Sequence, residues 1–311
     1  MSLPRPAQLS PNRVAFVLLA MVTLCWGINW PIMKLAVAEV PVWSFRAICA
    51  GAGALGLLGI AAATGQRFWP PSHQWGRLIL VAIPNVMLWN VLGVYGLKLL
   101  PSGRAAILAF TMPLWAVLLS MLVLGERLTP NRALGLLFGM AGMAVLMGGE
   151  AAHLAEAPVG SLLMIAAAFS WGAGTVLLKR FPIDLPTTAL TGWLLVLGGV
   201  PMLAGALIID PPIPWPPSHA ALFAVVYNML IAFIFCYWAW FKIVSLVPVN
   251  VSAMGSLMIP VVGTLSGMLL LGESVGWQEA VALALVLAAV ATVLRPASAA
   301  AARAGAGGRA V

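Results

Sequence analysis

The stretch TLCWGINWPIMKLA at residues 23–36 recurs in weaker form as AFSWGAGTVLLKRF at residues 168–181. The Trp-Gly pair of the first stretch matches the Trp-Gly pair of the second at an offset of 145 residues, and a lysine follows each tryptophan by eight residues. Similar stretches at a fixed offset indicate that a chain contains two copies of one structural unit.

A second pair of stretches keeps nearly the same offset. The stretch ILAFTMPLWAVLLSMLVLGERL, which contains Pro113, aligns with MGSLMIPVVGTLSGMLLLGESV, which contains Pro260, and each carries a Gly-Glu pair near its end. The features follow one another in the same order in both halves of the chain. The sequence therefore predicts two repeats, at residues 14–149 and 159–294.

The composition is that of a membrane protein. Hydrophobic residues make up 62% of the 311 residues and charged residues 8%, with a mean hydropathy of +1.05, whereas soluble domains carry about 25% charged residues. A helix needs roughly 20 apolar residues to cross a bilayer. Ten runs of this length can be delimited, at residues 14–36, 42–64, 75–97, 103–124, 130–149, 159–179, 186–209, 218–243, 249–271 and 276–294.

The predicted fold is an all-α polytopic membrane protein of ten transmembrane helices in two inverted five-helix repeats. The repeats are inverted because five is an odd number of crossings. With the N-terminus in the cytoplasm, twelve Lys and Arg residues fall on the cytoplasmic side and three on the other, which satisfies the positive-inside rule. Residues 1–13 are then a cytoplasmic segment, and the Ala/Gly/Arg-rich residues 295–311 a disordered cytoplasmic tail.

These repeated features resemble the EamA-type transporters of the drug/metabolite transporter superfamily over residues 14–294. The Trp-rich spans are similar to the aromatic and neutral amino-acid exporter branch of that superfamily. The resemblance implies ten helices around a central cavity, and export of small metabolites across the bacterial inner membrane. Inverted-repeat transporters place their substrate near the midplane between the halves, so we expect the first, third, fourth, sixth, eighth and ninth spans to line the path.

One face of the first span carries candidate cavity residues. Trp26, Asn29 and Trp30 share a helix face with Met33 because they follow helical spacing. Pro31 lacks an N–H and leaves the carbonyl of the residue four positions earlier without its helical partner. We therefore expect a kink near this proline.

The two repeated tryptophans are candidate gates. Trp26 lies about 18 Å along the first helix from its start, at ~1.5 Å per residue, which places it in the outer half of the bilayer. The repeat places Trp171 in the inner half. The alternative is that both tryptophans only pack between helices.

Further cavity or gate candidates are polar, aromatic or sulfur-containing side chains in four other spans, whose alternative role is to hold the bundle together by interhelical hydrogen bonds. They are Asn85, Trp89, Tyr95, Thr111, Met112, Trp115, Asn228, Tyr237, Trp238 and Met258. Candidate hinges, which could instead be static kinks, are Gly27, Pro31, Pro113 and Pro260.

Arg46 is a possible cavity charge, because an ionisable residue inside a membrane span is a candidate functional group. It lies only a few residues inside the second span. The alternative is that its long side chain extends to the interface and pairs with Glu39.

Several chemistries find no support in the sequence. His73, His153 and His219 stand alone without metal-ligand spacing, so neither a metal nor another cofactor is expected, and the scattered basic residues do not indicate a nucleic-acid partner. No Asp or Glu lies deep in a span, which leaves proton coupling and facilitated diffusion both open. The oligomeric state also stays open.

The predicted function is export of small amphipathic metabolites, with aromatic or neutral amino acids as the leading class. The predicted partners are this small-molecule substrate and the lipid bilayer. Two alternatives remain: an exporter of drugs or other lipophilic cations, which should carry a membrane carboxylate, and a membrane-embedded lipid-handling enzyme, which should carry a catalytic constellation.

Overall fold

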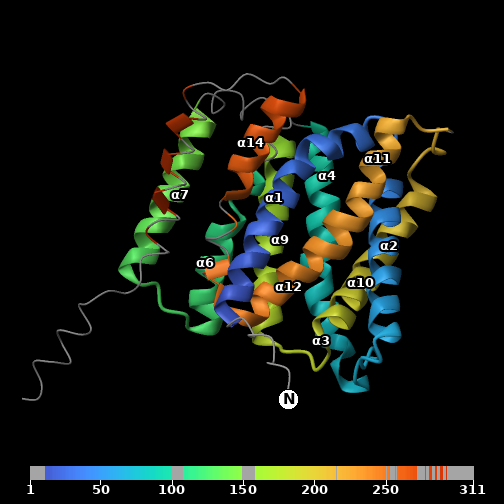
Figure 1. Ribbon diagram of the computed structural model, residues 1–311, viewed down its shortest axis with the longest axis horizontal. Coiled ribbons are helices and arrows are strands. Elements are labelled where there is room, and N and C mark those ends of the chain that lie inside the picture. Colours follow the sequence, from blue (N-terminus) through green and yellow to red (C-terminus); the bar gives the residue numbers. More distant parts are fainter. Residues whose placement is uncertain are drawn as a thin grey trace, which may run out of the picture.

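The computed structural model describes residues 11–99, 108–148, 158–214, 216–249, 251–252, 256 and 258–271, together with residues 277, 280–281, 284–285, 288–289 and 292. These residues form helices and no strands (Figure 1). The whole of the expected tail at 295–311, most of the expected leading segment at 1–13 and much of the tenth expected span lie outside the described residues.

The helices follow the expected spans closely in most of the chain. The first half contains α1 (Pro11–Val37), α2 (Val42–Ala63), α3 (Trp75–Ala82), α4 (Trp89–Leu99), α6 (Met112–Leu124) and α7 (Pro130–Gly148). The second half contains α9 (Pro158–Arg180), α10 (Thr187–Ile208), α11 (His219–Tyr227), α12 (Tyr237–Leu246) and α14 (Met258–Leu271). A short 3₁₀ turn, η1 (Ser72–Gln74), precedes α3.

Six helical segments of the described chain are long and apolar enough to cross a membrane. They are Asn12–Val37, Val42–Ala63, Ser72–Leu97, Val159–Arg180, Thr187–Ile208 and His219–Leu246. Shorter apolar helices occur at Met112–Leu124, Ala133–Gly142 and Met258–Leu270. The structure is therefore that of a multi-pass membrane protein, and the total of ten spans stays a prediction.

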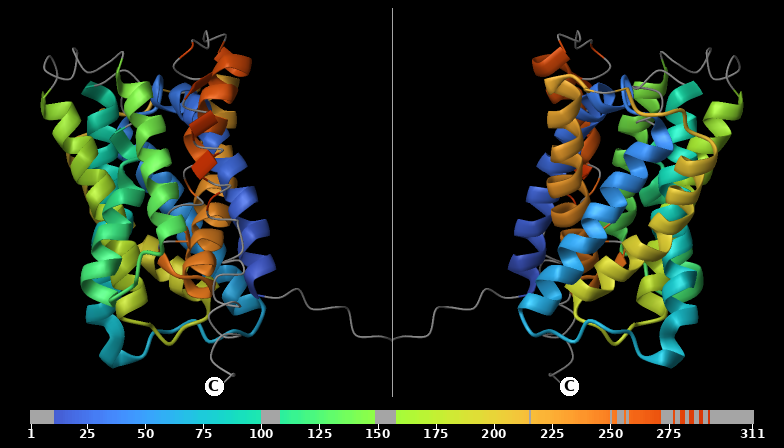
Figure 2. Two further views of the ribbon diagram at one scale, coloured as in Figure 1. Left: turned by 90° about the vertical axis from the view of Figure 1, so that its left-hand side faces the viewer. Right: turned by 90° about the vertical axis from the view of Figure 1, so that its right-hand side faces the viewer.

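The outer surface of the bundle is apolar, as a lipid-facing surface must be. Leu55, Leu122 and Leu207 expose 77%, 82% and 79% of their area, and each belongs to a different helix. Most helices run side by side, and α2 and α10 are inclined to the others (Figure 2). An apolar exterior of this kind is typical of a protein embedded in a bilayer.

The two halves contact each other in matched pairs of helices. Helix α1 packs on α14, and its counterpart α9 packs on α6. Helix α1 also contacts α11 and α12, and α9 contacts α3 and α4. The second helices of the two halves, α2 and α10, pack along each other (Figure 1). We call these two helices the α2–α10 pair.

Gly27 of α1 and Gly172 of α9 mark the closest approach of these helices to the other half. A Cβ atom added at Gly27 would lie 2.5 Å from the Cβ atom of Val262, and one at Gly172 would lie 3.1 Å from the Cβ atom of Trp115 and 2.9 Å from the backbone nitrogen of Ala116. The Gly172 contact is the counterpart of the Gly27 contact in the other half. The glycine of each Trp-Gly pair therefore lets two helices touch.

In the fourth expected span and in the ninth, which is its counterpart in the second half, the helix given in the structure begins just before the proline. Helix α6 starts at Met112, so Pro113 lies in its first turn, where a missing N–H breaks no helical hydrogen bond. Residues 110–111 form a turn, so the helix is interrupted within the expected span 103–124, next to Pro113. Pro260 also lies in a first turn, that of α14.

Two π-helical segments interrupt the third span and its counterpart in the second half. Segment η2 (Ile83–Leu88) joins α3 to α4, and segment η3 (Asn228–Cys236) joins α11 to α12. Such segments are rare and occur often at functional sites. The hydrophobic pattern of the sequence does not predict them, because a π turn changes the period only locally.

Hydrogen bonds join the loops at the end of the α2–α10 pair where α2 begins. The backbone N–H of Ser44 donates to Oδ2 of Asp210 at 2.6 Å. The backbone N–H and the hydroxyl of Ser218 donate to the carboxylate of Glu39 at 2.8 and 2.5 Å. The hydroxyl bond, followed by the backbone bond, lowers the pKa of Glu39 below its usual value because both stabilise the charged form.

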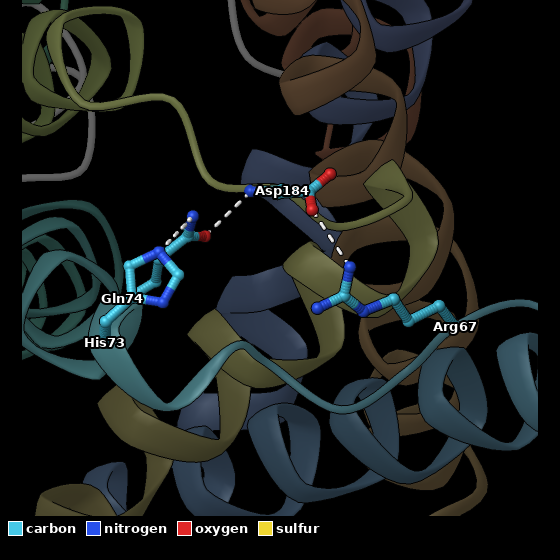
Figure 3. A network of polar contacts seen from close by, with 4 residues as sticks. All are labelled: Arg67, His73, Gln74 and Asp184. Atoms are coloured by element: carbon cyan, nitrogen blue, oxygen red, sulfur yellow. Dashed lines mark hydrogen bonds and ion pairs between the residues drawn. The ribbon is translucent and has the colours of Figure 1, made fainter.

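A second network joins the loops at the opposite end of the pair (Figure 3). Nη1 of Arg67 lies 2.9 Å from Oδ2 of Asp184, and the backbone N–H of Asp184 donates to Oε1 of Gln74 at 2.8 Å. The amide nitrogen of Gln74 lies 3.3 Å from Nε2 of His73. The α2–α10 pair is thus fixed at both ends.

We predict that Gly172→Ala destabilises the protein and that Gly51→Ala does not. The added methyl group at Gly172 overlaps the backbone of α6, and overpacking of this kind costs about 1–3 kcal/mol. At Gly51, in α2, the new Cβ atom meets no heavy atom within 4 Å. Thermal unfolding of both variants in one detergent measures the difference, and an unchanged midpoint for Gly172→Ala would contradict the close contact.

Candidate functional site

A cavity of about 90 Å³ lies between the two halves. Its wall contains residues from α1, α4, α6, α9, η3, α12 and α14, which lie in the six spans expected to line a path, and also from α2. The lining residues are Trp26, Asn29, Trp30, Met33, Arg46, Trp89, Asn90, Gly93, Val94, Phe110, Met112, Met164, Trp171, Ala232, Phe233, Tyr237 and Ile259.

Aromatic rings in mutual contact dominate this wall. The ring centroids of Trp26 and Trp171 are 5.5 Å apart in an edge-to-face arrangement. Trp171 also lies 5.1 Å from Trp89 and 5.7 Å from Tyr237, and Tyr237 lies 6.0 Å from Trp26. Four rings from α1, α4, α9 and α12 therefore form one cluster, which we call the aromatic cluster.

The contact between Trp26 and Trp171 differs from the expectation of two separate layers. Helices α1 and α9 run in opposite directions. The loop after α1 leads into the start of α2, and there it contacts the residue before α11. The loop after α9 contacts the loop that follows the other end of α2, so α9 ends at the opposite side of the bundle. Side chains on a helix lean toward its N-terminus. Each tryptophan therefore leans toward the other, and the two rings meet.

The polar groups of the cavity are few. Nδ2 of Asn90 donates to the carbonyl oxygen of Val86 at 2.8 Å and to the hydroxyl of Tyr237 at 2.9 Å, which links α4 to α12. Oδ1 of Asn29 and Nε1 of Trp171 are buried without a hydrogen-bond partner. Among the residues that the structure describes, no group of three His, Cys, Asp or Glu side chains could hold a metal ion.

Arg46 contributes a cationic side chain to the cavity wall. Its Nη2 atom lies 2.8 Å from the sulfur of Met33, and its Cζ atom lies 5.2 Å and 5.9 Å from the ring centroids of Phe45 and Phe233. Its Nε atom is buried and has no hydrogen-bond partner. Within the described part of the chain, no carboxylate forms an ion pair with this guanidinium.

The alternative role of Arg46, a pair with Glu39 at the interface, is wrong. Glu39 instead accepts two hydrogen bonds from Ser218 in the loop before α11. The guanidinium points into the bundle, since its contacts are the apolar and aromatic side chains of α1, α2 and η3.

Pro31 leaves the carbonyl of Gly27 without its helical donor, as the sequence predicts. The hydroxyl of Ser266 in α14 lies 3.4 Å from this carbonyl oxygen and 2.9 Å from that of Gly263. Helix α1 nevertheless continues through the proline to Val37. The hinge roles of Gly27, Pro31, Pro113 and Pro260 stay predictions.

Two side-chain hydrogen bonds attach α1 to the helix that contains η3. Nε1 of Trp26 donates to the carbonyl oxygen of Ala232 at 3.4 Å. The hydroxyl of Tyr227 donates to the carbonyl oxygen of Cys25 at 2.8 Å. Trp26 thus has both an interhelical bond and a place in the cavity wall. The two roles proposed for it from the sequence do not exclude each other.

Asn85 and Asn228 are fully buried but lie outside the cavity wall. Asn85 packs against Gly174 of α9, and neither atom of its amide has a hydrogen-bond partner. Asn228 donates to the carbonyl oxygen of Ala224 at 2.9 Å within its own helix. The sequence offered two roles for these asparagines, a place in the cavity wall or a hydrogen bond to another helix. Neither amide has a hydrogen bond to another helix in the structure.

Five other candidates also lie outside the wall: Tyr95, Thr111, Trp115, Trp238 and Met258. The hydroxyl of Tyr95 accepts a bond of 2.6 Å from Nε1 of Trp43, which joins α4 to α2. Trp115 packs on Phe169 of α9 at 5.5 Å. These contacts favour packing roles for Tyr95 and Trp115.

Some wall residues were not among the sequence candidates. Met33 shares the predicted face of α1, and Asn90 follows a candidate tryptophan, so both were visible in the pattern. Phe110, Met164 and Ile259 resemble any other apolar residue of a span. Only the fold brings these three to the cavity.

Comparison with known proteins identifies the family of this architecture. Residues 13–148 and 158–295 each match the EamA-like transporter family. A relative from Bacillus subtilis, named as the uncharacterized transporter YoaV, is 24% identical over 257 residues, which cover 82% of this chain and 87% of the relative. Homologues that cover most of the chain are thus named as transporters.

A second relative carries a more specific name. The aromatic amino acid exporter YddG of Ancylobacter novellus is 36% identical over 123 residues, which cover 39% of this chain and 42% of the relative. Among solved structures, one crystal structure of a protein matches with a TM-score of 0.76 and 24% identity, over 92% of this chain and 98% of the other. This last match shows a shared fold.

We predict that Trp171→Ala destabilises the protein by about 3–5 kcal/mol, the range for removing a large buried aromatic side chain. Trp171 is 3% exposed and contacts the other three rings of the aromatic cluster. Trp69→Ala is the control, because this side chain is 60% exposed. Thermal unfolding in one detergent compares them, and equal midpoints for the two variants would show that the cluster adds little to stability.

Proposed function

This chain belongs to the EamA-like transporter family, and we propose that it exports small amphipathic metabolites, with aromatic or neutral amino acids as the leading class. The chain is a transporter and not an enzyme, in keeping with the names of its relatives. The proposed route is the cavity between the two halves, opened to one side of the membrane at a time.

The aromatic cluster is the observation that carries the proposal. Aromatic surface with a few fixed polar groups is the usual lining of a small-molecule site. Here Asn29, Asn90 and Arg46 supply the polar groups and the tryptophans supply the surface. A compound with one apolar and one polar end fits this wall better than a sugar or a phosphate ester does.

The name of one relative supports the substrate class. The protein from Ancylobacter novellus is named as an aromatic amino acid exporter, and it matches part of this chain. The cavity wall adds independent support, because the rings of Trp26, Trp89 and Trp171 can stack on an aromatic side chain.

Export of lipophilic cations is the second candidate function. A site for cations in a membrane should hold a carboxylate near the ligand. The described wall of this cavity holds a guanidinium, that of Arg46, and no Asp or Glu. The electrostatics therefore favour zwitterions or anions over cations.

The proposed movement leaves the α2–α10 pair in place. Its two helices belong to different halves and are joined at both ends by hydrogen bonds. The helices around the cavity contain the prolines of α1, α6 and α14 and the π segments η2 and η3, while in the pair Pro201 lies inside α10. Irregular helices of this kind line the sites of many transporters.

The proposed location is the bacterial inner membrane, with both termini in the cytoplasm. This orientation rests on the excess of Lys and Arg at one end of the predicted spans. The end of the bundle that contains Arg67 and Asp184 then faces the cytoplasm. The bilayer is the proposed environment, and the substrate the proposed partner.

Reconstituted protein should transport radiolabelled phenylalanine or another aromatic or neutral amino acid into or out of proteoliposomes. Equal rates with and without a pH gradient would indicate facilitated diffusion, and a rate that rises with the gradient would indicate proton coupling. Absence of flux for every amino acid of a broad panel, with folded protein in the vesicles, would refute the proposed substrate class.

The aromatic cluster should control this flux. We predict that Trp26→Phe and Trp89→Phe each reduce amino-acid flux about fivefold, since losing part of an aromatic contact costs ~1 kcal/mol. Trp69→Phe, in the loop after α2, should transport at the wild-type rate. Wild-type flux in both cavity variants would assign these tryptophans to packing alone.

A further inference from the structure

We propose that Arg46 binds the carboxylate of the transported compound and that Asn29 binds its amino group. The proposal rests on the proposed function, because it assigns the substrate chemistry of the same cavity. It also defines which end of an amino acid lies near which helix: the carboxylate lies toward α2 and the amino group toward α1.

The surroundings of Arg46 supply no negative charge. Its contact through Nη2 is with a thioether sulfur, that of Met33, which is a weak acceptor. The faces of Phe45 and Phe233 attract the cation through their π electrons but cannot neutralise it. An arginine inside a membrane protein is expected to pair with an anion, and the described wall of the cavity holds none.

A carboxylate matches the remaining capacity of Arg46. A guanidinium presents five N–H donors in a planar fork, which two oxygens of one carboxylate can accept in parallel. Nε of Arg46 is buried without a partner. A singly charged carboxylate would neutralise the guanidinium, whereas an amine would add a second positive charge beside it.

Asn29 stands in the right place for the other end of the ligand. Met33, which contacts Arg46, lies one helical turn beyond Asn29 on the same face of α1, so their Cβ atoms are ~5–6 Å apart. Oδ1 of Asn29 is a buried acceptor without a partner. The carboxylate and ammonium of an α-amino acid share one carbon atom, and their separation fits this spacing.

Two tryptophans beside Asn29 complete the arrangement. Trp26 and Trp30 flank Asn29 on the same face of α1 and line the cavity with it. Their rings offer π faces to an ammonium group and apolar surface to the ligand's side chain. The geometry therefore points to a zwitterion with a free carboxylate, rather than to an amine or an ester.

Binding of four matched compounds to the purified protein tests the assignment. They are L-phenylalanine, L-phenylalaninamide, phenethylamine and 3-phenylpropionate, with quenching of tryptophan fluorescence or displacement of radiolabelled phenylalanine as the readout. The amide and the amine, which lack the carboxylate, should bind about 10- to 100-fold more weakly than phenylalanine, the range for losing a hydrogen bond to a charged group.

Variants assign the effect to single residues. Arg46→Gln should bring phenylalanine and its amide to affinities within about threefold of each other, because neither compound then meets a cation. Asn29→Leu should weaken phenylalanine but leave 3-phenylpropionate unchanged, since that compound has no amino group. Arg77→Gln, which changes an exposed arginine of α3 outside the cavity wall, is the control and should behave as the wild type.

The outcomes separate this proposal from the proposed function. Equal binding of phenylalanine and its amide by the wild type would overturn the role of Arg46 while amino-acid export still stood. Failure of folded wild-type protein to bind or transport any of the compounds would overturn both. If Arg46→Gln does not fold, the wild-type comparison decides alone, and Arg46→Lys tests whether the planar fork is needed in addition to the charge.

Discussion

The close approach of Gly27 to α14 and of Gly172 to α6 is the constraint on which the cavity depends. At these two points a helix of one half touches the fourth span of the other, and the glycine contributes no side chain to the contact. The residue before each glycine is a tryptophan, and its direction is fixed once the glycine is in contact. Because the two helices run in opposite directions, both tryptophans lean toward the middle of the bundle. A larger residue in place of the glycine would displace the helix and the ring together.

Irregular backbone gathers around the same region. Pro31 interrupts the hydrogen bonding of α1, turns precede α6 and α14, and π segments interrupt the third and eighth expected spans. Inside a bilayer such backbone is tolerated only where protein or a cavity surrounds it. The α2–α10 pair is joined at both ends; Pro201 lies inside α10, whereas α2, which contributes Arg46 to the wall, has no proline inside it. In the proposed movement the α2–α10 pair stays in place while the helices around the cavity rearrange.

The sequence predicted the helical membrane architecture, the family and much of the cavity, because hydrophobic run length and repeated motifs are local signals. The face of α1 with Trp26, Asn29 and Trp30 lines the cavity as helical spacing requires. The contact between Trp26 and Trp171 was not predicted, because depth along a helix says nothing about the lean of a side chain. Asn85 looked like a cavity residue, yet a tertiary contact with Gly174 places it behind the wall.

The unpaired guanidinium also bears on how a transporter releases what it binds. If Arg46 had a carboxylate of the protein as its partner, a ligand would have to displace that partner, and the two would compete for one charge. With only sulfur and aromatic neighbours, the guanidinium can take an anion without breaking an ion pair. In the proposed alternation of access, water that enters when either side opens can then solvate both charges and weaken the bond between Arg46 and the substrate. The proposed bond between Arg46 and the substrate's carboxylate would thus give selective binding and still break when water reaches it, so that the substrate is released.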